Sequence, residues 1–349
     1  MFFDKFWQFF THDLGIDLGT ANTLVYIVGK GVVIRESSVV ARHKKTKEIL
    51  AIGASAKKMM GKTPGTIEAI RPLKNGVIAD FDACEVMLKK YIQLVHQSGR
   101  LVPMIAKPRV VIGIPSGVTE VERRAVQEVA LSAGARQAYL IEEPMAAAIG
   151  LGLAVQEAEG ILVVDIGGGT TEIAVISLGG IVVSKCLRIA GDEMDEAIIN
   201  YIRLKYSLLL GLATAEEVKI QIGSASPQKK EKHIVVRGRD LEAGLPKSVK
   251  LSSTEVREAL APVVRRIIDS ISAVLEETPP ELTSDIIKRG ISLCGGGSLL
   301  AGIDEVIIEA TKIPVWRTEN PMDMVVLGCS KVLADPELLQ KVKVSGGLR

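Results

Sequence analysis

The chain has 349 residues, of which 47% are apolar and 24% are charged, and its formal net charge is +2. This length exceeds one comfortable hydrophobic core, so we expect two or more domains. The near-neutral charge argues against nucleic acid as a partner, and no apolar run is long enough to span a bilayer. The four cysteines and four histidines show no zinc-binding spacing, and the scattered cysteines fit a reducing cytoplasm.

The first ten residues are unusually aromatic, because they hold five of the six phenylalanines in the chain. Their apolar positions recur at helical spacing beside a narrow polar stripe, which predicts an amphipathic segment over residues 1–12. Such a helix either docks on the protein's own core or lies in a membrane interface. We favour the membrane because a short terminal segment has little core within reach. The residues expected to meet lipid are Phe2, Phe3, Phe6, Trp7, Phe9 and Phe10.

A second apolar feature occurs at Leu101 and Val102, which stand between Gly99 and Pro103 and are therefore expected on a loop. These two residues either pack beneath a neighbouring element or make a second membrane contact. One short segment binds lipid weakly, so attachment would need avidity from many copies.

One short pattern, an Asp followed by glycines and threonines, occurs once in each half of the chain, at 17–23 and at 165–171. Each copy lies between two apolar stretches, which predicts a strand, a tight turn and a second strand. Glycine lets a backbone approach a ligand closely, exposed amides and hydroxyls donate to phosphate, and Asp can hold hydrated Mg²⁺. A single copy would usually be an ordinary turn, whereas two copies favour a polyphosphate gripped between related domains. The residues concerned are Asp17, Gly19, Thr20, Ala21, Asn22, Asp165, Gly167, Gly168, Gly169 and Thr170, with Asp17 and Asp165 as the metal-binding pair.

Strand and helix patterns alternate along the rest of the chain, which indicates an α/β fold. Residues 56–63 nearly match a phosphate-binding loop, but its first glycine is absent, so we discount it. Glu142, Glu143 and Pro144 predict the start of a helix, where a carboxylate either caps the helix or orients a water for attack on a γ-phosphate. Thr170 could donate a hydrogen bond to the same phosphate or water.

Two further stretches are candidates for the nucleoside end of such a site. Thr214 to Glu217 forms a capping-box pattern, which predicts the start of a helix. On that helix Glu216 and Lys219 share a face, and they either bind ribose and adenine or form a surface ion pair. Residues 295–297 are glycines after a short apolar strand. This turn either lets a base lie against backbone or is an ordinary glycine turn.

Together these segments resemble the actin/Hsp70/sugar-kinase ATPase superfamily and, within it, the MreB family of bacterial actin homologues. The likeness runs nearly from end to end, and it rests on the two hairpins, the helix at 143–148, the turn at 295–297, and the segments at 69–72, 76–81 and 279–282. It implies a ribonuclease H-like duplicated fold with four subdomains around a cleft that holds ATP and Mg²⁺. The implied divisions are a first domain at 13–147, with a smaller part at about 33–77, and a second at 148–349, with a smaller part at about 190–253.

The resemblance also implies roles for individual residues. Glu143, rather than Glu142, would position the attacking water with help from Thr170. The nucleoside pocket would be lined by Glu216, Glu217, Val218 and Lys219 together with Gly295, Gly296, Gly297, Ser298 and Leu299.

At the level of function, the resemblance implies a cytoplasmic, slow ATPase that polymerises into paired protofilaments on the inner face of the cell membrane. Such filaments organise cell-wall synthesis in rod-shaped cells, with membrane lipid and cell-elongation membrane proteins such as RodZ, MreC and MreD as partners. The competing hypotheses are a chaperone or a metabolite kinase on the same scaffold, and a scaffold that binds ATP without hydrolysing it. ATP turnover stimulated by sugars or unfolded peptides would favour the chaperone or the kinase.

Overall fold

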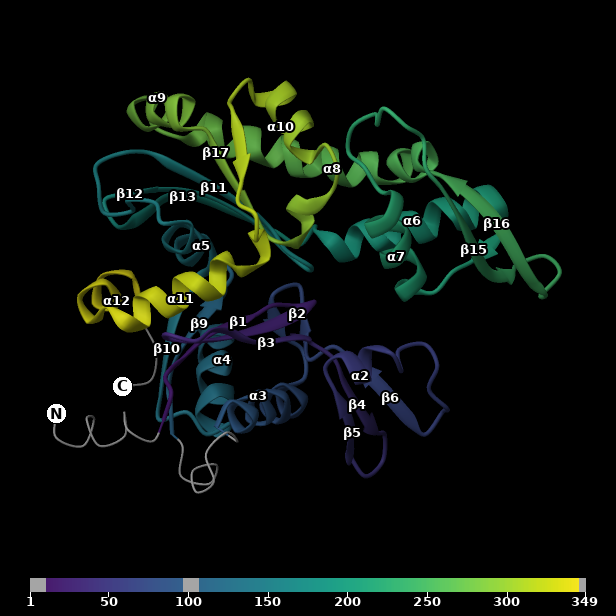
Figure 1. Cartoon of the computed structure of the whole chain (residues 1–349), viewed down its shortest axis with the longest axis horizontal. Coiled ribbons are helices and arrows are strands. Elements are labelled where there is room, and N and C mark those ends of the chain that lie inside the picture. Colours follow the sequence, from purple (N-terminus) through teal and green to yellow (C-terminus); the bar gives the residue numbers. More distant parts are fainter. Residues whose placement is uncertain (1–10, 97–106, 345–349) are drawn as a thin grey trace.

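Two five-stranded sheets with the same internal plan form the centre of the molecule (Figure 1). The computed structural model describes residues 11–96 and 107–344. The first sheet has the order β10-β9-β1-β2-β3 and the second β13-β12-β11-β17-β18. The two orders correspond when the second is read backwards. In each sheet the first strand of the hairpin has parallel neighbours on one side, and on its other side lie the antiparallel second strand of the hairpin and a return strand. The expected duplication of an α/β domain is therefore visible in the strand order.

The strand bounds place both predicted hairpins at the middle of a sheet. In the first sheet they are β1 (Leu14–Leu18), β2 (Asn22–Ile27), β3 (Gly31–Ser37), β9 (Arg109–Ile114) and β10 (Gln137–Glu142). In the second they are β11 (Ile161–Ile166), β12 (Thr171–Ser177), β13 (Gly180–Leu187), β17 (Ile291–Cys294) and β18 (Val315–Arg317). Every residue of β11 and β12 is buried, as expected for central strands covered on both faces.

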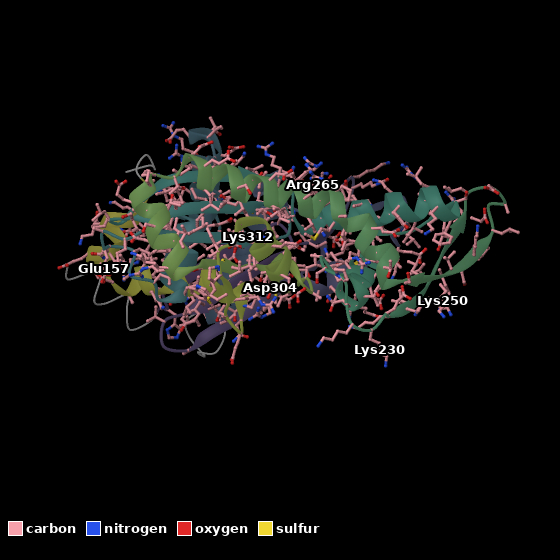
Figure 2. The ribbon with its side chains drawn as sticks, turned by 90° about the horizontal axis from the view of Figure 1, so that it is seen from above. Glu157, Lys230, Lys250, Arg265, Asp304 and Lys312 are labelled. Atoms are coloured by element: carbon pink, nitrogen blue, oxygen red, sulfur yellow. The ribbon has the colours of Figure 1, made fainter. Side chains whose placement is uncertain are left out.

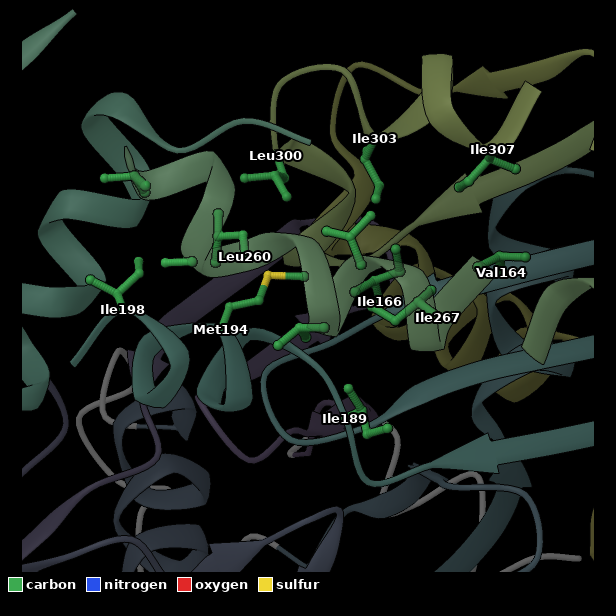
Figure 3. Packing of buried hydrophobic residues seen from close by; sticks show 14 of the residues in the cluster. Val164, Ile166, Ile189, Met194, Ile198, Leu260, Ile267, Leu300, Ile303 and Ile307 are labelled. Carbon is green, nitrogen blue, oxygen red and sulfur yellow. The ribbon is translucent and has the colours of Figure 1, made fainter. Parts of the chain in front are cut away.

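Helices cover the outer faces of the two sheets. Below the first sheet in Figure 1 lie α3 (Phe81–His96) and α4 (Glu120–Ser132), and above the second lie α8 (Ser253–Glu277), α9 (Pro280–Arg289) and α10 (Ile303–Thr311). Figure 3 shows Leu260 and Ile267 of α8 in the same buried cluster as Val164 and Ile166 of β11. Burial of such large aliphatic side chains is the main stabilising contribution to this half of the molecule.

Two smaller sheets extend to one side of the large ones (Figure 1). The first contains β4 (Val40–His43), β5 (Ile49–Ile52) and β6 (Ile67–Ile70), next to α2 (Ala54–Lys57); the ribbon β7 (Leu73–Lys74) and β8 (Val77–Ile78) leads back to the body. The second contains β14 (Leu208–Leu209), β15 (His233–Asp240) and β16 (Pro246–Ser252), next to α6 (Gly191–Tyr206) and α7 (Leu212–Ile222).

The capping-box prediction for α7 is wrong. The helix begins at Leu212, with Gly211 as its N-cap and no side-chain cap, so Thr214 lies inside the first turn. The helix starts earlier than its capping pattern because tertiary packing determines its position. Ala215 and Val218 are buried in the hydrophobic core and stabilise the helix independently of the local cap.

The helices α5 (Glu143–Leu151) and α11 (Met324–Ala334) pack against each other between the two sheets, and α12 (Pro336–Val342) follows them. Their backbones approach closely at glycines: a Cβ on Gly150 would collide with the carbonyl of Met324, and one on Gly328 with the carbonyl of Ala146. The late helix α11 also lies on the first sheet, where a Cβ on Gly15 would be 2.8 Å from the Ser330 nitrogen. The C-terminal helix α11 therefore packs on the N-terminal sheet and completes its core.

We expect Gly328→Val to lower the free energy of unfolding by about 3 kcal/mol, because the added side chain must separate α11 from α5. Urea unfolding followed by circular dichroism measures the change. The matched control is Gly65→Val, since a Cβ there meets nothing within 4 Å. Equal stability of the two variants would contradict the close packing.

Charged side chains of both signs project from the surface, as the labelled Glu157, Lys230, Lys250, Arg265, Asp304 and Lys312 illustrate in Figure 2. Across residues 11–96 and 107–344, no helix combines the length and the apolar character that crossing a membrane would require.

Candidate nucleotide-binding site

The tips of both hairpins line a single cavity of about 500 Å³ between the two halves of the molecule. Asp17 and Asp165, which stand at the ends of β1 and β11, both line it. The predicted site residues that this cavity brings together are Asp17, Gly19, Thr20, Ala21, Asn22, Glu143, Asp165, Gly167, Gly168, Gly169, Thr170, Glu216, Lys219, Gly295, Gly296, Gly297 and Leu299.

The hairpin tips touch each other, and glycine makes this contact possible. A Cβ on Gly168 would lie 2.6 Å from the Cβ of Ala21, and one on Gly169 would lie 2.6 Å from Thr20 Oγ1. Between the tips, the amide of Gly76 donates to Thr20 Oγ1 at 2.9 Å. The second hairpin thus presents glycine backbone without side chains to the first, which leaves room for phosphate oxygens to approach.

The third glycine cluster is held against Asp165. Gly295 has a φ of 79°, and a Cβ there would collide with Asp165 Oδ1. Ser298 does not line the cavity; it is buried and its hydroxyl donates to the Gly295 carbonyl at 2.6 Å, so it supports the turn instead.

Three carboxyl groups line the cavity: Asp165 is buried, and Asp17 and Glu143 are partly buried. Burial, followed by the charge of Asp165, raises the pKa of Asp17 to about 8. Burial, followed by the charge of Glu172, raises the pKa of Asp165 to about 7 and also lifts the pKa of Glu143 well above its usual value. Uncompensated carboxylates of this kind fit a divalent cation with its water shell. Within the described ranges no three His, Cys, Asp or Glu residues form a metal cluster, so the cation would take its other ligands from water and phosphate.

These raised pKa values predict how pH affects the nucleotide-free protein. Between about pH 4 and pH 8 the folded state holds protons on Asp17 and Asp165 that the unfolded state has released, so the free energy of unfolding falls as pH rises. Thermal melting at several pH values measures this slope. Asp17→Asn removes one of the two groups, and we expect a shallower slope in that variant. The prediction fails if both proteins lose stability equally over this range.

At the nucleoside end, Glu216 and Lys219 have separate partners. Lys57 of α2 reaches Glu216 at 2.8 Å across the cavity, whereas Lys219 contacts Asp195 at 2.8 Å and donates to the Gly191 carbonyl at 2.7 Å. The alternative of a surface ion pair between Glu216 and Lys219 is therefore wrong. Their neighbours on α7 do not line the cavity: Glu217 is exposed and accepts from Gln221, and Val218 is buried in the core.

Two further ion pairs join the halves, and no local sequence pattern predicts them. Arg71 contacts Asp192 at 2.5 Å and Arg35 contacts Asp323, in the 3₁₀ helix η2 (Pro321–Asp323), at 2.6 Å. The Arg71–Asp192 partners are 121 residues apart in the chain, so only the fold brings them together. With Lys57–Glu216 these contacts make three bridges between the two halves, which we call the cross-cleft ion pairs.

The residues predicted to meet a membrane, Phe2, Phe3, Phe6, Trp7, Phe9, Phe10, Leu101 and Val102, lie outside the described residues.

A duplicated pair of sheets around one acidic, glycine-lined cavity is the architecture of an actin-like protein. The sequence matches the family described as MreB/Mbl protein over residues 11–341. The chain belongs to this family.

Individual relatives agree with this assignment over almost the whole chain. The cell shape-determining protein MreB of Escherichia coli is 52% identical over 94% of this chain and 95% of its own length. The cell shape-determining protein Mbl of Bacillus subtilis is 48% identical over 96% of this chain and 100% of its own. The structures of MreB5 of Spiroplasma citri bound to ADP and to AMPPNP have TM-scores of 0.87 and 0.86, with 38% identity and coverage of 95% of this chain and 98% of theirs. The predicted actin-like fold and the predicted family are confirmed.

Proposed function

We propose that this chain is an ATP-dependent, membrane-associated cytoskeletal protein that forms filaments and organises cell-wall synthesis in rod-shaped cells. The observation that carries the proposal is the single cavity between two duplicated hairpins, with Asp17 and Asp165 both lining it. The nucleotide-bound structures of the Spiroplasma relative support ATP as the ligand, and the names of the bacterial relatives support a role in cell shape.

In this proposal the two hairpins hold the phosphates, and α7 with the turn at 295–297 holds the nucleoside. The amides of Gly168 and Gly169 and the hydroxyl of Thr20 would donate to phosphate oxygens. Asp17 and Asp165 would hold Mg²⁺ through water, and the bound ion would neutralise phosphate charge. Glu216, Lys219 and the turn at 295–297 would line the nucleoside pocket. We also propose that the chain forms four subdomains. The first domain spans 13–147, with a smaller subdomain at about 33–77, and the second spans 148–349, with a smaller subdomain at about 190–253.

Hydrolysis would depend on Glu143 and Thr170. Glu143 stands in the first turn of α5, is partly buried and lines the cavity. Its carboxylate would accept a hydrogen bond from a water and hold that water in line with the γ-phosphate. Thr170, at the edge of the second hairpin, would donate to the same water or to the phosphate. Since phosphoryl transfer relies on positioning and electrostatics, this small set of residues is sufficient for a slow ATPase.

The proposed membrane attachment uses residues 2–10 together with Leu101 and Val102. The described residues that flank both segments meet at one edge of the molecule: the amide of His12 donates to His96 Nε2 at 3.2 Å, and Arg109 contacts Asp13 at 2.7 Å. Both segments therefore leave the body from neighbouring points, which favours their acting on one surface. Partners in this proposal are further copies of the chain, lipid of the inner membrane face, and membrane proteins such as RodZ, MreC and MreD.

Ultracentrifugal pelleting of the full chain tests the proposal. We expect sedimentation with ATP and Mg²⁺, and co-sedimentation with anionic vesicles that is reduced by deleting residues 2–10 and by replacing Leu101 and Val102 with serine. A protein that stays monomeric with and without ATP or vesicles would contradict the filament. Turnover stimulated by sugars or unfolded peptides would instead favour a kinase or a chaperone.

A further inference from the structure

Glu172 is a buried carboxylate that the proposed nucleotide chemistry does not use. It lies on β12 and is only 1% exposed. In the sheet register it is opposite Asp165 of β11 on one side and Cys186 of β13 on the other, so all three side chains lie on the same face. That face looks towards the cavity, because Asp165 lines the cavity.

Besides Cys186 on the neighbouring strand, Glu172 has a hydrogen-bond partner in the other half of the molecule. Both the backbone amide of Ser116, at 3.1 Å, and the Ser116 hydroxyl donate to Glu172 Oε2. Ser116 is also buried and follows the end of β9 in the first sheet. The Ser116–Glu172 contact is therefore a doubly hydrogen-bonded, water-excluded link between the two halves, and this kind of charge-assisted bond is among the stronger ones in proteins.

The link joins two strands that adjoin the groups proposed for hydrolysis. On the first sheet, β9 ends two residues before Ser116, where Ile114 pairs with Glu142, the residue before Glu143. On the second sheet, β12 begins at Thr171, between Thr170 and Glu172. Glu172 is thus two residues from Thr170, and Ser116 follows by two residues the end of a strand that pairs with the neighbour of Glu143.

The Ser116–Glu172 link lies directly behind the cavity. A Cβ on Gly76, which lines the cavity, would lie 2.5 Å from Pro115 Cγ and 3.1 Å from Thr170 Cγ2. Among the charges that act on Glu143, that of Glu172 has the largest effect, ahead of those of Asp17 and Asp165. The Ser116–Glu172 link and the Glu143 carboxylate therefore lie close enough for the charge of Glu172 to act on Glu143.

We propose that Glu172 is a positioning residue for hydrolysis: by accepting both hydrogen bonds of Ser116, it fixes Glu143 of one half against Thr170 of the other. This inference rests on the proposed ATPase function. Because attack on a phosphate needs the water to be held in line, a small displacement of Glu143 relative to Thr170 slows the reaction more than it weakens nucleotide binding.

Three variants of the full chain separate the link from the charge of Glu172. Ser116→Ala removes the hydroxyl donor, Glu172→Met removes the acceptor at similar side-chain length, and Glu172→Gln keeps an amide oxygen that can accept both bonds. We expect Ser116→Ala and Glu172→Met to lower kcat for ATP hydrolysis about tenfold with little change in KM. Glu172→Gln should recover most of the rate lost in Glu172→Met. Combining Ser116→Ala with Glu172→Met in one chain should give a rate no slower than that of Glu172→Met alone.

The matched control is Ser226→Ala. This variant removes another buried serine hydroxyl that donates to a glutamate, Glu305, at 2.6 Å, but within the second half only. Its kcat should stay at the wild-type value.

Three results would overturn the inference: unchanged kcat in Ser116→Ala and Glu172→Met, kcat lost equally in Glu172→Gln and Glu172→Met, or an equal loss in Ser226→Ala. Thermal melting identifies a variant that fails to fold, in which case the remaining variants decide. If the wild-type protein itself does not hydrolyse ATP, the proposed function fails, which is a different outcome from active wild type with unaffected variants.

Discussion

Glu143→Gln is expected to lower the rate of ATP hydrolysis by about 10²–10⁴-fold while leaving ATP binding intact. The side chain lines the cavity beside Asp17 and Asp165, which we assign to Mg²⁺, so Glu143 is the carboxylate left to accept a hydrogen bond from the attacking water. The amide of glutamine keeps the shape of the side chain but loses the negative charge that polarises the water. Phosphate release at saturating ATP measures hydrolysis, and displacement of a fluorescent nucleotide measures binding.

The neighbouring carboxylate provides a matched control for this prediction. Glu142 does not line the cavity, and it ends β10 rather than beginning α5. Glu142→Gln should therefore hydrolyse ATP at close to the wild-type rate. If Glu142→Gln were inactive and Glu143→Gln active, the two glutamates would have to exchange roles.

Gly168→Val is expected to weaken nucleotide binding by about ten- to a hundredfold. A Cβ at this position would already lie 2.6 Å from the Cβ of Ala21, so the larger side chain must force the hairpins apart or occupy the space of a phosphate. Both outcomes remove donors from the phosphates. Equilibrium titration with a fluorescent ATP analogue measures the affinity.

Gly180→Val is the control for this second prediction. Gly180 begins β13 and a Cβ there approaches only the Ser177 carbonyl, at 3.9 Å. Valine also favours strands, so affinity should be unchanged. Normal binding by Gly168→Val would show that the hairpins need not touch when nucleotide is bound.

The local sequence pattern was sufficient to predict the hairpins and the helix to which we assign phosphate binding and hydrolysis. The hairpins at Asp17 and Asp165 lie where alternating apolar residues and glycine turns place them, and Pro144 stands in the first turn of α5 as expected. These features depend on residues close together in sequence, whose conformational preferences can be added along the chain.

Features that depend on distant partners could not be predicted in this way. The link of Lys57 to Glu216 spans 159 residues, and that of Ser116 to Glu172 spans 56. Likewise α7 begins before its capping pattern, because burial of Ala215 and Val218 outweighs a local cap worth about 1 kcal/mol. For the same reason nothing in the sequence near Glu172 distinguished it from the other residues of a buried strand.

The cross-cleft ion pairs have a consequence for how the empty molecule responds to its surroundings. Their side chains remain partly open to water, with exposures of 34% and 25% for Lys57 and Glu216, so dissolved potassium and chloride weaken them by screening. In the proposed site, a ribose held by Glu216 would compete with Lys57 for that carboxylate. We therefore expect loading and unloading of nucleotide to quicken as electrolyte concentration rises.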